Sequence, residues 1–142
     1  MFQKRFAIPQ KSTIFENLNQ IFFNLMDAKL NKCSWIIHLF AVAHAISSFA
    51  MGQWGLDDEI LLSLLTISTI VLIAYIYKVP LEVSAALAVL CCFAGYYLGT
   101  LGGKWLTASG IDFLIKYSNE ITTFVVTEIL GWSATIIAAK RN

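Results

Sequence analysis

The stretch ILLSLLTISTIVLIAYIY, residues 60–77, decides the fold class of this chain. It has 18 positions without a charged residue and without Asn, Gln, Gly or Pro. A run of roughly 20 apolar residues is the length that an α-helix needs to cross a ~30 Å hydrocarbon core. The stretch therefore predicts a transmembrane helix and, for the chain, an all-α membrane protein.

The composition of the whole chain agrees with a membrane environment. Hydrophobic residues make up 58% of the 142 positions, charged residues only 13%, and the mean hydropathy is +0.69. Ordinary soluble domains carry about 25% charged residues. We therefore expect one domain that lies mostly in lipid, with little chain left for a separate soluble module. The net charge of +1 gives no sign of a nucleic-acid partner.

Three further apolar stretches lie before and after residues 60–77: residues 34–54, 81–103 and 121–139. With a span at residues 59–77 they predict a polytopic protein of four transmembrane helices, forming a domain of residues 34–142. The turn around Pro80 is short, so the second and third spans are expected to form an antiparallel hairpin. The fourth span contains Glu128, and a re-entrant or interfacial helix is the alternative for it.

A separate amphipathic helix is predicted at residues 13–30, within an N-terminal segment of residues 1–33. Thr13 and Glu16 have the spacing of a capping box, which satisfies free amides at a helix start. Apolar residues then recur at three- and four-residue spacing: Ile14, Phe15, Leu18, Ile21, Phe22, Leu25 and Met26. Such a helix lies in the headgroup interface or packs on its neighbours as a cytoplasmic collar, and both alternatives stay open.

The distribution of positive charge predicts the topology. The N-terminal segment contains five Lys and Arg residues, the loop between the second and third spans contains one, and the C-terminus contains two. The loop between the third and fourth spans contains two Lys residues, and the loop between the first and second spans contains no Lys or Arg. One side of the membrane would thus carry eight positive residues and the other side two. Because positively charged loops stay in the cytoplasm, this distribution predicts an integral membrane protein with both termini cytoplasmic.

A ridge of small residues runs along the third span, at Gly95, Gly99 and Gly103. In lipid, close backbone approach through small residues is a main source of helix association. The ridge predicts either a contact with another helix of the same chain or a subunit interface, which includes the wall of a pore. The second alternative makes the chain a homo-oligomer.

Among the polar residues inside the predicted spans, four are candidates for a functional role: Glu128, His38, His44 and Ser48. A charge near the bilayer centre costs about 2.5 to 3.5 kcal/mol on insertion scales, so Glu128 is expected to pair with a group such as His or to line an ion path. His38 and His44 project about 120° apart on a helix and do not form one metal site. No metal or cofactor is expected. Each histidine is a satisfied buried residue or a sensing residue that faces Glu128.

The region from residue 44 onward resembles a known family. Asp58 precedes the second helix, Leu62 follows one turn later, Tyr77 closes that helix, and Thr127 and Gly131 mark the last one. This pattern is similar to the small helical membrane domain of unknown function that is often fused to Era-like GTPases in bacteria. The resemblance implies a bacterial inner membrane and a GTPase partner encoded separately, since this chain has no phosphate-binding Gly-x-x-x-x-Gly-Lys-Ser/Thr loop. This sequence departs from the family's pattern at Thr66, Thr69 and Lys78.

Two functional hypotheses follow, and neither is an enzyme, because the sequence shows no catalytic constellation. The first is a homo-oligomeric pore or membrane-perturbing effector, in which the glycine ridge joins subunits and His44, Ser48 or Glu128 faces a central path. The second is a membrane anchor or scaffold that recruits a cytoplasmic protein partner through the amphipathic helix. Because the chain devotes almost all of its length to the membrane, the sequence favours the pore.

Overall fold

The computed structural model describes residues 11–141, apart from the side chains of residues 11–15, 18 and 22. The chain forms α1 (Lys11–Trp54), α2 (Glu59–Ile76), α3 (Leu81–Ala108), α4 (Asp112–Lys116) and α5 (Ser118–Arg141). Residues 11–141 contain no strand. All of these helices except α4 contain a stretch long and apolar enough to cross a membrane. The prediction of an all-α chain with four such helices is confirmed.

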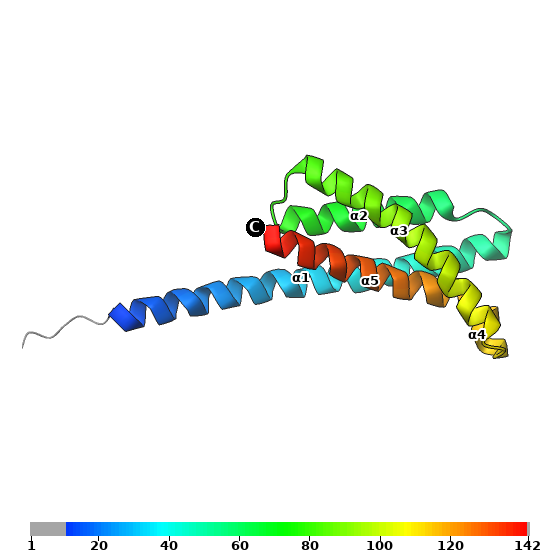
Figure 1. Ribbon diagram of the computed structural model, residues 1–142, viewed down its shortest axis with the longest axis horizontal. Coiled ribbons are helices and arrows are strands. Elements are labelled where there is room, and N and C mark those ends of the chain that lie inside the picture. Colours follow the sequence, from blue (N-terminus) through cyan, green and yellow to red (C-terminus); the bar gives the residue numbers. More distant parts are fainter. Residues whose placement is uncertain (1–10, 142) are drawn as a thin grey trace, which may run out of the picture.

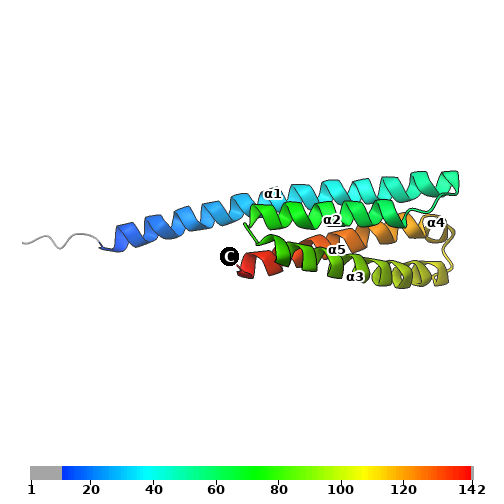
Figure 2. The same cartoon turned by 90° about the horizontal axis from the view of Figure 1, so that it is seen from above.

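The four long helices run side by side as a bundle, and the N-terminal part of α1 projects beyond it (Figures 1 and 2). α1 and α3 each contact both α2 and α5, and α2 also contacts α5. α1 and α3 do not touch each other within the described residues. They therefore lie on opposite sides of the bundle, with α2 and α5 between them.

The turns between helices are set by local backbone chemistry. α1 ends where Gly55 adopts a left-handed φ of +63°, and the Leu56 amide donates to the Met51 carbonyl at 2.9 Å. This is the Schellman arrangement, in which glycine avoids the strain of a left-handed residue. Lys78 has a φ of 54° in the turn between α2 and α3, just before Pro80. The predicted hairpin of the second and third spans is thus present in the fold.

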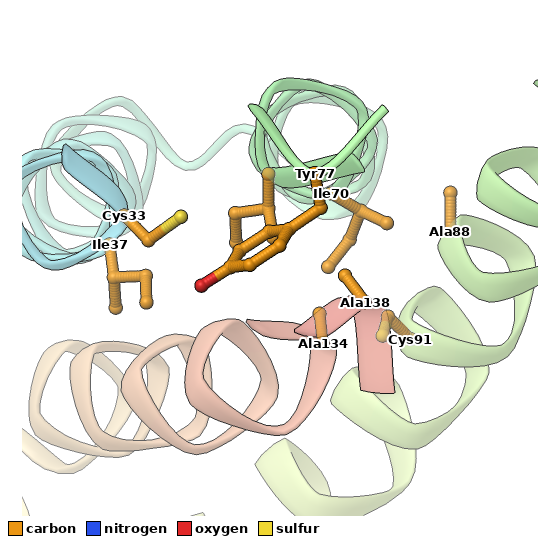
Figure 3. Close-up of a cluster of buried hydrophobic side chains, with 9 residues drawn as sticks. Cys33, Ile37, Ile70, Tyr77, Ala88, Cys91, Ala134 and Ala138 are labelled. Atoms are coloured by element: carbon orange, nitrogen blue, oxygen red, sulfur yellow. The ribbon is translucent and has the colours of Figure 1, made fainter. Parts of the chain in front are cut away.

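A cluster of buried side chains lies where the end of α2 and the C-terminal half of α5 approach α1 and α3 (Figure 3). Its buried residues come from all four long helices: Cys33, Ile37, Ile70, Ile73, Tyr77, Ala88, Cys91, Ala134 and Ala138. We refer to these nine residues as the apolar cluster. The Lys29 ammonium lies 5.5 Å from the centre of the Tyr77 ring, at the edge of this cluster.

Helix bounds differ from the sequence-based ones in three places. The predicted surface helix is not separate from the first span, because α1 runs unbroken through residue 33. The physical reason is that residues 11–51 contain neither Gly nor Pro, so nothing interrupts the helix. α3 continues to Ala108 rather than residue 103, and α5 begins at Ser118 rather than residue 121.

Candidate functional site

A polar cavity of about 320 Å³ opens at the end of the bundle that carries the α1 to α2 loop. Asp58 and Glu59 lie at this end, and Gly95 and Gly99 of α3 form part of the wall. The other lining residues include several polar side chains: His44, Ser48, Thr66, Asn119, Thr122 and Thr127.

The apolar cluster closes the cavity at its inner end. On α1 the cavity residues are His44 and Ser48, whereas the cluster residues Cys33 and Ile37 lie more than one turn closer to the N-terminus. On α3 the two sets meet at the adjacent residues Cys91 and Cys92, and Leu130 of α5 both lines the cavity and packs against the cluster. A single subunit therefore has a recess that is open at one end, not a path through the bundle.

His44 is the titratable side chain buried in the cavity wall, with 2% of its surface exposed. Its Nδ1 lies 2.7 Å from the Phe40 carbonyl oxygen, so Nδ1 carries a proton and donates it. Its Nε2 lies 3.1 Å from Thr66 Oγ1 and 3.2 Å from the Leu62 carbonyl oxygen. In the neutral ring Nε2 can only accept, and the single hydrogen of the Thr66 hydroxyl can go to Nε2 or to the Leu62 carbonyl oxygen at 2.9 Å. A protonated ring would instead donate to Thr66 and Leu62, so His44 contacts α2 in either state.

A second polar group lies outside the cavity, where α1 meets α5. His38 Nδ1 is 2.6 Å from Glu128 Oε1, and the Trp132 Nε1–H donates to Glu128 Oε2 at 3.1 Å. The His38 side chain is 56% exposed and that of Glu128 is 18% exposed. The histidine that meets Glu128 is therefore His38, while His44 bonds to α2. The four predicted polar residues form two sites on different sides of α1, not one path.

The predicted glycine ridge faces the inside of the chain. A Cβ at Gly95 would lie 3.2 Å from Leu130 Cδ1, and one at Gly103 would lie 3.9 Å from Asn119 Oδ1, both on α5. Gly99 has nothing within 4 Å of that position and lines the cavity. Of the two alternatives in the sequence, the structure places Gly95 in an intramolecular contact between α3 and α5.

Two closer glycine contacts were missed by sequence reasoning. A Cβ at Gly102 would lie 2.6 Å from Thr122 Cγ2, and one at Gly131 would lie 2.8 Å from Ile37 Cγ1. The signal for Gly131 was present, because Thr127, Gly131 and Thr135 repeat every four residues on α5, and all three are buried. Such small-residue repeats mark close helix contacts in lipid.

The N-terminal part of α1, residues 11–28, extends past the bundle, and we call it the arm. Ile21, Phe23 and Leu25 are 56%, 62% and 60% exposed, and Met26 is 39% exposed. Leu25 therefore lies on an uncovered face, as an amphipathic surface helix requires. The side chains of Phe15, Leu18 and Phe22, which the sequence assigned to the same surface, lie outside the described residues, as does that of Thr13 in the predicted capping box.

Residues 11–141 contain no group of three or more His, Cys, Asp or Glu side chains arranged to hold a metal ion. Comparison with family models, curated proteins and solved structures finds no match to this chain. The resemblance to the membrane domain of Era-like GTPases stays a prediction. Of the residues that suggested it, Asp58 lies at the cavity mouth and Gly131 at the contact with Ile37.

Proposed function

We propose that this chain is an integral membrane protein that acts as a non-conducting anchor and recruits a cytoplasmic partner through its arm. The observation that carries the proposal is the unbroken extension of α1. At 1.5 Å per residue, the 18 residues 11–28 reach about 27 Å beyond the bundle. The positive charges of the N-terminal segment place this extension in the cytoplasm.

A straight arm differs from a helix that lies in the membrane interface. An interfacial helix turns away from the span it precedes, whereas α1 continues into its span without a break. Large apolar side chains exposed on a helix that stands in water are typical of a protein interaction surface. Phe23 and Met26 are three residues apart on one face of the arm, and both are exposed.

We expect the double variant Phe23→Asp, Met26→Asp to release the partner from the membrane while the bundle stays folded. Two carboxylates on the docking face cost several kcal/mol if they are buried, so recovery of the partner with purified membranes should fall at least about tenfold. The control is Asn19→Asp, Asn24→Asp, which adds the same charge at exposed polar positions of the arm. Equal recovery with both double variants would contradict the anchor.

A pore is the second candidate, and the polar cavity is the observation that favours it. The apolar cluster blocks that cavity within one subunit, so we expect liposomes containing the purified protein to show no K⁺ or proton flux above protein-free liposomes. A flux that disappears in the Gly99→Leu variant, whose side chain would enter the cavity, would overturn the anchor in favour of the pore.

A further inference from the structure

α1 carries a continuous apolar seam from the arm into the bundle. The seam residues alternate at spacings of four and three: Ile14, Leu18, Ile21, Leu25, Ala28, Lys32, Trp35, Leu39, Val42, Ile46 and Phe49. All of them except Lys32 are apolar. This is the seven-residue repeat of a left-handed coiled coil, held over five repeats.

From Ile21 onward, no other described helix covers this seam. From Ile21 to Phe49 every seam residue is exposed, with Leu25 at 60%, Leu39 at 66% and Ile46 at 62%. The α1 residues that pack inside the bundle, such as Ile37, Ala41 and His44, lie on a different face of the helix. We infer that two copies of the chain pair along this seam as a parallel, two-stranded coiled coil that runs from the membrane into the cytoplasm.

Three features make a second copy the occupant. Copies inserted with the same topology have parallel α1 helices, so equivalent seam positions meet in register. In the arm, which stands in water, Ile21 and Leu25 are more than half exposed and gain hydrophobic free energy when they are paired. Inside the span lipid is as apolar as a second helix, so pairing there depends on van der Waals packing along Leu39, Val42 and Ile46.

The third feature is the polar group beside the seam. His38 lies next to Leu39, and its Nε2 has no hydrogen-bond partner among the described residues. Glu128, the partner of His38, lies halfway along α5, about 18 Å along the helix axis from Lys140. His38 therefore also lies deep within the span. A histidine exposed at that depth faces hydrocarbon in a single copy. Pairing along the seam brings His38 close to a second copy, and a hydrogen bond across the pair would lower this cost.

Lys32 fits the same arrangement. It is four residues before Ile36 and one before the buried Cys33, close to the level where Lys29 meets Tyr77 at the end of the bundle. A long lysine side chain at headgroup level extends its ammonium into water. One lysine at a core position of a coiled coil lowers stability and selects register and strand number.

The inference rests on the membrane insertion and topology of the proposed function but uses a different face of the arm from the one assigned to the partner. We would introduce single cysteines at Leu25 and Leu39 in the seam, and at Phe23 and Phe93 as controls. The controls are 62% and 74% exposed, so all four sites accept a cysteine without disturbing the bundle. Oxidation in membranes is expected to give disulfide-linked dimers at Leu25→Cys and Leu39→Cys only, above the level of the native chain. Equal cross-linking at Phe23→Cys, or none at both seam sites, would overturn the pairing.

A second measurement tests the contribution of His38. The mass of the nanodisc-inserted protein is expected to be that of two copies, and His38→Leu should raise the dimer dissociation constant about threefold, the scale of one hydrogen bond in lipid. A single copy, a larger ring or a different protein cross-linked at the seam would overturn the inference. Loss of the partner in Phe23→Asp, Met26→Asp with intact seam cross-links would show that pairing and recruitment are separate.

Discussion

Replacing Gly131 with leucine is expected to destabilise the contact between α1 and α5 strongly. Even a Cβ at this position would lie 2.8 Å and 2.9 Å from two carbons of Ile37, which is fully buried in the apolar cluster. Ile37 has no room to move, so α1 and α5 must separate. Overpacking of this kind costs typically 1–3 kcal/mol and occasionally more, and we expect about 3 kcal/mol of unfolding free energy to be lost.

The matched control is Gly99→Leu on α3. Nothing lies within 4 Å of a Cβ at Gly99, and the leucine side chain has the cavity to extend into. Replacing glycine within a helix also gains up to about 1 kcal/mol from helix propensity, so the control should be neutral or slightly stabilised. Unfolding in a detergent titration measures both variants. Equal destabilisation of the two would show that the contact between Gly131 and Ile37 does not organise the bundle.

Replacing His44 with alanine is the second large expected effect. The variant loses the hydrogen bond from α1 to Thr66 of α2 and the packing of a ring that is 2% exposed. Thr66 keeps a partner, because its hydroxyl also lies 2.9 Å from the Leu62 carbonyl oxygen of its own helix. The lost packing therefore dominates, and we expect a loss of about 2–3 kcal/mol.

The control for this variant is Ser48→Ala, one turn further along the same wall of the cavity. Ser48 is 5% exposed, and its hydroxyl makes no hydrogen bond to the described part of the chain. Removing it should change the unfolding free energy by less than about 1 kcal/mol. A His44→Ala variant as stable as Ser48→Ala would show that the ring does not join α1 to α2, and that water entering from the cavity replaces it.

Part of the candidate sites could be predicted from local patterns. The small-residue spacing on the third span predicted a close helix contact, and Gly95 makes one with Leu130. A histidine partner for Glu128 was among the alternatives, but spacing along one helix could not say which histidine. Helical periodicity gives the angle between two side chains of the same helix, whereas the rotation and axial position of a neighbouring helix depend on packing across the whole contact.

The sequence by itself determined the helical class and the four long apolar helices, because both depend on residues close together in the chain. Uncharged runs and the positions of glycine and proline act within one helix. Only the tertiary structure decided that His44 lines an internal cavity, that His38 meets Glu128 on the outside, and that Gly131 of α5 packs directly on Ile37 of α1. Those facts arise from side-chain volumes that interlock between helices distant in sequence, and no pattern within a single helix contains them.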